Sequence, residues 1–163
     1  MEILNKKRAL ITGASGEIGS AIAEELHKNG CEVLLSGTRK EPLRQLAEKL
    51  GVRAHFIMSN LRNMKNAHLL VEKSIEKMGG IDILINNAGI TRDTLFMRMS
   101  DDEWSDVLEV NLNSSMALSR GVIKNMIKSR WGRIINITSI VGITGNPGQA
   151  NYAASKSALI GMS

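Results

Sequence analysis

The 163-residue sequence has one cysteine, two prolines, two phenylalanines, two tryptophans and a single tyrosine. The lone cysteine, Cys31, excludes an internal disulfide and is typical of a reducing compartment, so a cytoplasmic location is predicted. No apolar run reaches the roughly 18 residues that a membrane-spanning helix needs. The first residues, MEILNKKRALI, lack the apolar region of a signal peptide. The sequence therefore predicts a soluble protein without a membrane partner.

Metal and nucleic-acid sites also lack their usual signals. The three histidines (His27, His55 and His68) lie far apart and have no second ligand at metal-binding spacing. The few aromatic residues are not interleaved with runs of Lys or Arg, as they are in many nucleic-acid-binding surfaces. Neither a metal ion nor a nucleic acid is therefore predicted as a partner. The net charge of +5 is moderate and is compatible with an acidic binding partner.

Apolar runs typical of buried strands alternate with amphipathic helical patterns along the whole chain. Strands are predicted at residues 8–11, 32–36, 53–58, 81–85 and 133–137. Helices are predicted at residues 18–29, 42–50, 65–78 and 101–129, and from residue 149 onward. This alternation predicts an α/β fold with a doubly wound parallel sheet, the Rossmann fold. The chain, residues 1–163, is long enough for one such domain with a core of its own.

Glycines mark the passage from the first predicted strand to the first predicted helix. Gly13, Gly16 and Gly19 follow Thr12 at intervals of three. Glycine lets the backbone approach a pyrophosphate closely, and a helix N-terminus offers free N–H groups and the positive end of a dipole. A glycine pattern alone is a weak signal, but its place after the first strand predicts a dinucleotide site.

The end of the second predicted strand selects the nucleotide. NAD sites place a carboxylate there to bind the ribose hydroxyls, and such a carboxylate would repel the 2′-phosphate of NADPH. Here the sequence reads Ser-Gly-Thr-Arg-Lys over residues 36–40, with two cations and no carboxylate. This favours NADPH, although Arg39 and Lys40 could instead be solvated residues before a helix.

The only tyrosine, Tyr152, stands four residues before Lys156 and thirteen after Ser139. In a helix, residues four apart share a face, with Cβ atoms roughly 5–6 Å apart. Two unit charges about 4 Å apart attract by about 4 kcal/mol at an effective dielectric of 20. An ammonium at that distance would lower the pKa of the phenol, so the pair could serve in proton transfer. Taken alone, a tyrosine four residues before a lysine is most often an ordinary exposed pair.

These motifs together resemble the short-chain dehydrogenase/reductase family, over residues 7–163. The resemblance rests on the glycine turn, on NNAG at residues 86–89, on Asn111, and on Ser139 with Tyr152 and Lys156 in the family's order. The segments NNAGITRDTLFMRM, GRIINITSIVG and GNPGQANYAASKSALIGMS are most similar to bacterial 3-oxoacyl-[acyl-carrier-protein] reductases of fatty-acid synthesis. The expected reaction is NADPH-dependent reduction of a 3-oxoacyl thioester to the 3-hydroxyacyl form.

The resemblance also implies roles for single residues. Tyr152 would be the general acid, and Ser139 would donate a hydrogen bond to the substrate carbonyl. Lys156 would lower the pKa of Tyr152 and hold the nicotinamide ribose. Asn111 would lie at a helix irregularity and position a water in a proton relay. The expected cofactor-binding residues, besides Tyr152 and Lys156, are Gly13, Ser15, Gly16, Ile18, Gly19, Thr38, Arg39, Asn60, Leu61, Asn87, Ala88 and Gly89.

Two features depart from the family pattern. The family has glycine at position 17, where this chain has Glu17, which suits the helix dipole but would repel a pyrophosphate if it pointed inward. Family reductases also continue for roughly 80 residues beyond the position of Ser163, to the size of a larger domain. The Rossmann domain is therefore expected to be incomplete at its C-terminus, and a full-length homotetramer is expected only for the longer chain.

The resemblance makes an acidic acyl carrier protein the expected partner. Lys124, Lys128, Arg130 and Arg133 cluster before Ser139 and could steer it, with Arg130 and Arg133 as the contacts, or could simply complement a helix dipole. The methionines at 97 and 99 could line an acyl channel or fill the core. Two other functions remain open: reduction of acetoacetyl-CoA or another ketone, and non-catalytic nucleotide binding by a fragment.

Overall fold

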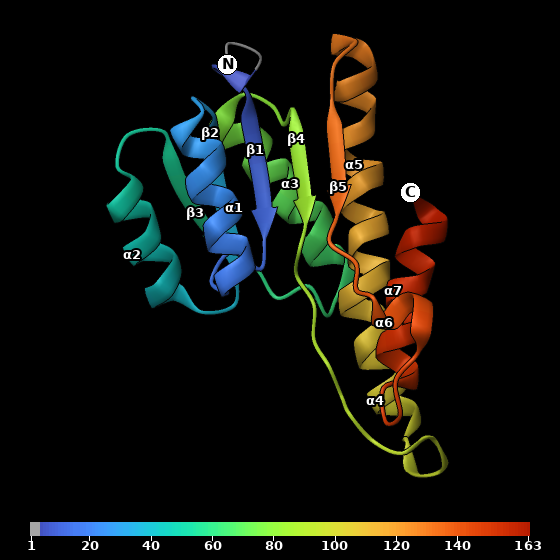
Figure 1. Ribbon diagram of the computed structural model, residues 1–163. Coiled ribbons are helices and arrows are strands. Elements are labelled where there is room, and N and C mark those ends of the chain that lie inside the picture. Colours follow the sequence, from blue (N-terminus) through green and yellow to red (C-terminus); the bar gives the residue numbers. More distant parts are fainter. Residues whose placement is uncertain (1–3) are drawn as a thin grey trace.

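The computed structural model describes residues 4–163 and contains one five-stranded parallel sheet (Figure 1). Its strands are β1 (Arg8–Thr12), β2 (Glu32–Gly37), β3 (Ala54–Met58), β4 (Ile83–Asn86) and β5 (Arg133–Asn136). Their order in the sheet is β3-β2-β1-β4-β5. This confirms the predicted doubly wound α/β fold.

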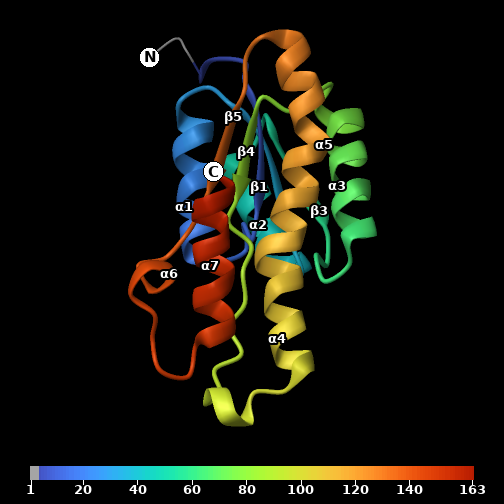
Figure 2. The same cartoon turned by 90° about the vertical axis from the view of Figure 1, so that its right-hand side faces the viewer.

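Helices cover both faces of the sheet, as Figure 2 shows with the sheet seen from its β5 edge. One face carries α1 (Glu17–Lys28) and α2 (Lys40–Leu50), and the other carries α3 (Met64–Met78) and α5 (Ser114–Ser129). The remaining helices, α4 (Asp101–Leu108), the short α6 (Val141–Thr144) and α7 (Ala150–Met162), lie towards the carboxyl ends of the strands. None of the helices in the described part is long and apolar enough to cross a membrane.

Successive side chains of each strand enter two separate apolar layers. Leu10, Leu34 and Leu84 pack in the layer that includes residues of α3 and α5. Their strand neighbours, such as Ile11 and Leu35, pack in the layer that includes residues of α1 and α2. Burial on both faces explains why the strands read as continuous apolar runs. Each fully buried side chain of this size stabilises the fold by about 1.5–3 kcal/mol.

The strand order reverses beside β1. The chain runs outward from β1 through β2 to β3, and then returns to the other side of β1 for β4 and β5. Open α/β sheets bind ligands in the crevice at the carboxyl ends of the strands at such a point. The loops after β1 and β4 therefore frame the candidate site.

The helix expected over residues 101–129 is not continuous. Ser100 caps α4 as predicted, and with Glu103 it forms a capping box in which each side chain bonds the other's backbone N–H. A π-helical turn, Glu109–Asn113, then separates α4 from α5. The apolar pattern did not reveal this turn because the helical turns on either side keep their own periodicity.

Other differences concern the ends of elements. β3 begins at Ala54, because Arg53 has a φ of 73°, which lies outside the strand region. β4 begins at Ile83 rather than at residue 81. α2 begins at Lys40, and Pro42 stands in its first turn, where the missing N–H would have no helical partner in any case.

Candidate active site

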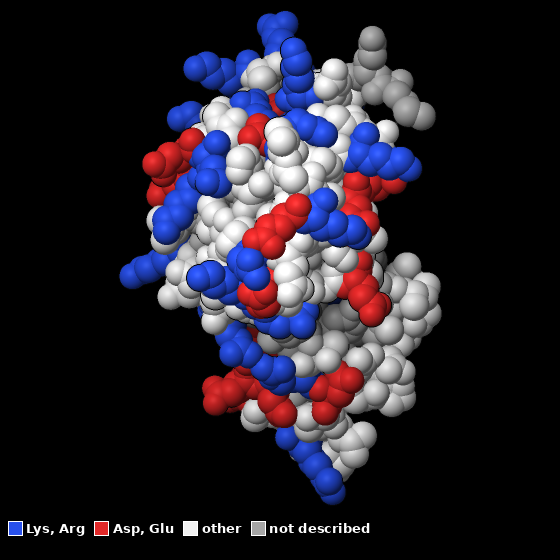
Figure 3. Space-filling view, turned by 90° about the vertical axis from the view of Figure 1, so that its left-hand side faces the viewer, with Lys and Arg blue, Asp and Glu red and all other residues white. Residues whose placement is uncertain are grey.

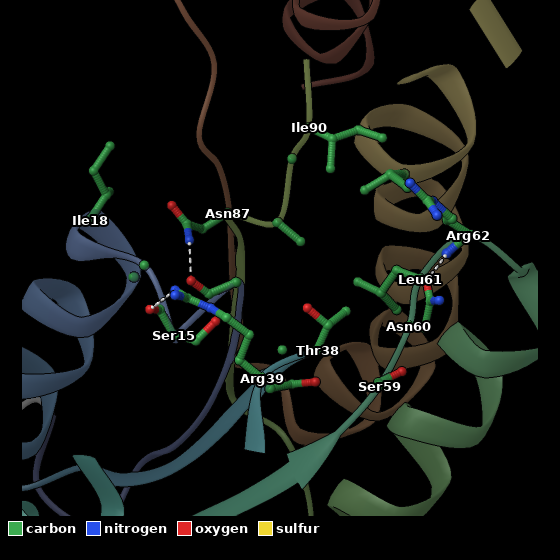
Figure 4. Close-up of a pocket in the computed structure, with 18 of the residues that line it drawn as sticks. Ser15, Ile18, Thr38, Arg39, Ser59, Asn60, Leu61, Arg62, Asn87 and Ile90 are labelled. Carbon is green, nitrogen blue, oxygen red and sulfur yellow. Dashed lines mark hydrogen bonds between the residues drawn. The ribbon is translucent and has the colours of Figure 1, made fainter. Parts of the chain in front are cut away.

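A cleft of about 790 Å³ opens at the carboxyl ends of β1, β2 and β4, beside the segment that follows β3. Figure 4 shows Ser15 and Arg39 on one side of this cleft and Asn60, Leu61 and Arg62 on the other. It is lined by all twelve residues outside α7 that the sequence predicts to bind a cofactor, namely Gly13, Ser15, Gly16, Ile18, Gly19, Thr38, Arg39, Asn60, Leu61, Asn87, Ala88 and Gly89. The structure thus brings together residues that are up to 76 positions apart, as Gly13 and Gly89 are.

The glycine turn after β1 is sterically specified at two positions. Gly13 has a φ of +64°, which favours glycine, and a Cβ on Gly19 would lie 2.5 Å from the carbonyl oxygen of Gly13. Glycine at these positions lets α1 begin directly against the end of β1. α1 has Gly16 as its N-cap, without a side-chain cap, so its first N–H groups are free to bind an anion.

Asn87 braces this turn from the neighbouring strand. Its Nδ2 donates hydrogen bonds to the carbonyl oxygens of Thr12 at 2.9 Å and Gly13 at 3.2 Å. In return, the hydroxyl of Thr12 accepts hydrogen bonds from the backbone N–H groups of Asn87 at 3.1 Å and Ala88 at 3.0 Å. The loops after β1 and β4 are therefore locked to each other at the floor of the cleft.

The end of the cleft beside β2 carries positive charge. Arg39 Nη2 donates a hydrogen bond to the carbonyl oxygen of Ser15 at 2.5 Å, so the guanidinium lies against the glycine turn (Figure 4). Gly37 stands where an NAD site would have its carboxylate, and Arg62 adds a second cation to the lining. Glu17, the residue that departs from the family pattern, is exposed and also borders the cleft.

The residues present fit a dinucleotide. The hydroxyl of Ser36, a cleft-lining residue with 1% exposure, has no hydrogen-bond partner among the described residues. A buried polar group is seldom left unpaired, and this one lies where a nucleotide would add polar atoms. The glycine turn, the free helix N-terminus and Arg39 beside β2 match the pyrophosphate and phosphate groups of such a ligand.

α7 positions the tyrosine and the lysine on one side, as the spacing predicts. The ammonium of Lys156 lies 5.7 Å from the centroid of the Tyr152 ring. Lys156 is 4% exposed, and its Nζ donates a hydrogen bond to the carbonyl oxygen of Ile137 at 2.7 Å. Burial lowers the pKa of Lys156, because the charged form loses its hydration. The pair is therefore not an ordinary exposed pair.

Ser139 reaches the same region from the end of β5. Its Oγ accepts a hydrogen bond from the N–H of Val141 at 3.2 Å. The segment is pressed against α7 at Gly142, where a Cβ would lie 2.8 Å from the backbone of Lys156. Within residues 4–163, no hydrogen bond joins the hydroxyls of Ser139 and Tyr152, so both remain available to a substrate.

Asn111 lies within the π-helical turn and is fully buried. Its side-chain amide pairs with both backbone groups of Ile90 and also donates to Ser155 Oγ at 3.0 Å. A Cβ on Gly89 would lie 3.4 Å from Asn111 Oδ1 and 3.6 Å from Lys156 Nζ. Two of the catalytic candidates, Asn111 and Lys156, therefore meet the cleft at Gly89. The backbone carbonyl of Asn111 accepts a hydrogen bond from Ser115 Oγ at 3.0 Å, and its Oδ1, which accepts from the N–H of Ile90, keeps a second lone pair.

The four cations before Ser139 do not lie where their closeness in sequence suggested. Arg133 begins β5 and pairs with Ile83 at the start of β4, whereas Ser139 follows the other end of β5. α5 ends at Ser129, on the same edge as Arg133. The cluster therefore lies at the amino-terminal edge of the sheet. Figure 3, which faces the β3 side of the molecule, shows that Lys and Arg side chains are numerous at this end. The prediction that these cations lie at the entrance of the site is therefore wrong for a single chain. β5 runs from the amino-terminal to the carboxyl-terminal edge of the sheet and separates Arg133 from Ser139.

Some lining residues were not identified from the sequence, namely Ser59, Arg62, Ile90 and Val110. Ser59 and Arg62 flank the predicted pair Asn60 and Leu61, so their place after β3 was a usable signal. Val110 belongs to the π-helical turn, whose position periodicity does not reveal. No group of three or more His, Cys, Asp or Glu side chains in the described part could hold a metal ion.

Comparison with known proteins agrees with this geometry. Nodulation protein G of Rhizobium sp. (strain N33) is 53% identical over 160 residues, which cover 98% of this chain and 65% of that protein. The 3-oxoacyl-[acyl-carrier-protein] reductase of Rickettsia bellii is 51% identical over 159 residues, which cover 98% of this chain and 64% of that protein. The enzyme of the same name from Aquifex aeolicus is 47% identical over 167 residues, which cover 99% and 67%, respectively.

The chain thus spans 64–67% of the length of these three relatives. A family model described as short chain dehydrogenase matches residues 7–163. The match includes every element of the sheet and all the candidate residues in the cleft and on α7. The chain therefore belongs to the short-chain dehydrogenase family of oxidoreductases.

Proposed function

We propose that this chain carries the nucleotide-binding and proton-donating parts of an NADPH-dependent reductase of 3-oxoacyl-[acyl-carrier-protein]. The observation that carries the proposal is the meeting of the cleft with the catalytic candidates at Gly89, beside Asn111 and Lys156. Tyr152 stands one helical turn from that lysine. A ketone placed there would face a phenol, an ammonium and the hydroxyl of Ser139.

In the proposed reaction, the phenol of Tyr152 donates its proton to the carbonyl oxygen of the substrate. The hydroxyl of Ser139 donates a hydrogen bond to the same oxygen and stabilises the charge that develops on it. The ammonium of Lys156 favours loss of the phenolic proton by its charge, which burial makes more effective. A bound reduced nicotinamide dinucleotide would supply the hydride.

The choice of NADPH over NADH rests on the charges beside β2. Arg39 lines this part of the cleft, and Gly37 carries no side chain that would repel a 2′-phosphate. Arg62 adds a cation on the opposite side, after β3 (Figure 4). The hydroxyl of Thr38 adds a hydrogen-bond donor at the same strand end. Arg62 also forms an ion pair with Asp106 at 3.3 Å, so Arg39 is the stronger candidate for the phosphate contact.

Exposed apolar side chains near the start of α7 support the proposal that the substrate carries an acyl chain. Phe96 is 74% exposed and Met97 is 87% exposed, so Met97 does not fill the core. Ile140, directly before α6, is 67% exposed, and Ile143, within α6, is 73% exposed. The backbone bond from Thr94 N to Gly148 O, at 2.9 Å, ties the first of these segments to the loop before α7. An acyl chain could cover these side chains.

The proposal extends to a homotetramer and to docking of an acidic acyl carrier protein. On α5, Ile123 is 46% exposed and Ile127 is 70% exposed, which suits packing against a second copy. α5 runs from the π-helical turn at the site to the cation cluster at the opposite edge. Two α5 helices packed antiparallel would place Arg130 and Arg133 of one copy beside the site of the other.

Two other functions remain candidates. Nodulation protein G is as similar to this chain as the acyl-carrier reductases are, so similarity alone does not select the acyl-carrier substrate. Reduction of acetoacetyl-CoA or another ketone is therefore one alternative. Non-catalytic nucleotide binding is the other, because none of Ser139, Tyr152 and Lys156 is among the residues that line the cleft. A cytoplasmic location fits each of these functions.

Oxidation of NADPH by the purified chain, measured with 3-oxoacyl-[acyl-carrier-protein], acetoacetyl-CoA and an unrelated ketone, tests the proposal. Binding of NADP⁺ and NAD⁺ is measured separately by calorimetry. Faster turnover of the carrier-bound substrate is expected. Equal turnover of all three substrates would favour a general ketone reductase. Nucleotide binding without any turnover would favour the non-catalytic function.

A further inference from the structure

Asn151 directly precedes Tyr152 in the first turn of α7, and it is fully buried at 0% exposure. Its Nδ2 donates hydrogen bonds to the carbonyl oxygens of Arg92 at 3.1 Å and Glu103 at 3.2 Å. Its Oδ1 accepts a hydrogen bond from the N–H of Tyr152 at 2.7 Å. One buried side chain therefore joins the segment after β4, the helix α4 and the helix that carries the tyrosine.

Other contacts connect the same three segments at the surface. The hydroxyl of Thr94 donates to Glu103 Oε1 at 3.0 Å, and Thr94 N donates to the carbonyl oxygen of Gly148. Gln149 Nε2 lies 3.1 Å from both carboxylate oxygens of Asp93. The Gln149 contact is exposed, so water competes for it, whereas the buried amide has no such competitor.

We propose that Asn151 is a positioning residue whose amide clamps the segment after β4 against the first turn of α7 and thereby holds Tyr152 at the cleft. Asn151 holds the backbone carbonyl of Arg92, which is two positions after Ile90. Since Ile90 lines the cleft, the clamp fixes the segment next to the cleft wall. The part that concerns turnover rests on the proposed function, whereas the clamp itself does not. A purely local role, in which Asn151 only binds the N–H of Tyr152 within the first turn of α7, is the alternative to be separated from it.

Two substitutions separate these roles. Asn151→Asp keeps the size of the side chain and an oxygen for the Tyr152 N–H, but it replaces both donors with an oxygen that repels the two carbonyls. Asn151→Ala removes the bond to the Tyr152 N–H and the clamp together. Asn29→Ala is a matched control, because Asn29 Nδ2 donates to the carbonyl oxygen of Glu25 at 2.8 Å on the exposed end of α1.

The clamp is tested by backbone hydrogen exchange, read by mass spectrometry on the whole chain. In both Asn151 variants we expect exchange to rise about tenfold or more in residues 90–99 and in the first turn of α7, with β1 and β4 unchanged. Asn29→Ala should leave both segments as they are in the unchanged chain. If Asn151→Asp protects these segments as well as asparagine does, the side chain acts only through the N–H of Tyr152 and the proposal is wrong. A rise spread evenly over the sheet would also overturn it, because it would indicate general destabilisation.

Turnover and nucleotide affinity test the consequence for the site. Both Asn151 variants should lose at least about tenfold in kcat, while the Kd for NADP⁺ changes by less than about threefold. Loss of affinity to the same extent as kcat would overturn the positioning role, because the cleft itself would then be disturbed. If the unchanged chain shows no turnover, the proposed function fails, and the exchange experiment still decides whether the clamp exists.

Discussion

The side-chain amide of Asn111 pairs with both backbone groups of Ile90. Its Oδ1 accepts a hydrogen bond from the N–H of Ile90 at 2.8 Å, and its Nδ2 donates to the carbonyl oxygen of Ile90 at 3.0 Å. Asn111 belongs to the π-helical turn between α4 and α5, and Ile90 follows the NNAG segment after β4. This pairing holds the edge of the nucleotide cleft to the helix beside the catalytic candidates.

Replacing Asn111 with Ala should destabilise the chain and loosen residues 88–92. Each backbone group of Ile90 is partly buried, so leaving it without a partner costs up to about 1–3 kcal/mol. Chemical denaturation gives the change in the free energy of unfolding, and hydrogen exchange shows where protection is lost. The control is Asn113→Ala, in the same π-helical turn, since among residues 4–163 the Asn113 side chain bonds only the Glu109 side chain. Equal effects of the two substitutions would contradict the bracing role.

Replacing Tyr152 with Phe should remove turnover and leave NADPH binding nearly unchanged. The phenolic proton is needed only in the transition state, and a general acid contributes about 10²–10⁴-fold to the rate. Steady-state kinetics gives kcat, and calorimetry gives the affinity. A variant that keeps more than about a tenth of the kcat would exclude Tyr152 as the proton donor.

Replacing Gly37 with Asp should reverse the preference for NADPH over NADH. A carboxylate at this strand end repels a 2′-phosphate and can bind ribose hydroxyls. The Cβ at position 37 would lie 3.0 Å from Ser15 Oγ, a hydroxyl that can rotate away, so the variant should fold. The two affinities are compared by calorimetry, with Gly37→Ala as the control for side-chain size. The assignment fails if the unchanged chain binds NADH as tightly as NADPH at moderate salt.

The ion pair between Arg8 and Asp82 should make the fold sensitive to acid. Arg8 Nε and Nη2 donate to the two oxygens of Asp82 at 2.8 Å and 3.0 Å. Burial by itself would raise the pKa of Asp82, but the hydrogen bonds and the charge of Arg8 outweigh burial and hold that pKa below its usual value. This stability is therefore fully present above the unfolded pKa of about 3.9 and is lost as the pH falls through the lower folded pKa.

Asp82→Asn should flatten that part of the dependence of unfolding free energy on pH. The exposed residue Asp101 provides the control, because Asp101→Asn removes a carboxylate that forms no ion pair in the described structure. Urea denaturation across acidic pH measures both. If the Asp82 variant shows the same acid sensitivity as the unchanged chain, the ion pair is not its source.

The sequence by itself determined the strands and the parallel sheet, because these depend on local patterns. The roles of the candidate site residues came from the order of the motifs, through their resemblance to the short-chain dehydrogenase/reductase family. Apolar runs identify strands that are buried on both faces, and glycine at positions 13 and 19 meets backbone demands that no other residue satisfies. The spacing of Tyr152 and Lys156 specifies a shared helix face because the helical repeat does so.

Only the tertiary structure decided which distant groups meet. The π-helical turn, the pairing of Asn111 with Ile90 and the burial of Asn151 arise from packing between α4, α7 and the segment after β4, which leaves no local pattern. The cations before Ser139 are the clearest contrast. They are near it in sequence, but β5 carries the chain from one edge of the sheet to the other, so Arg133 and Ser139 lie at opposite ends of a strand.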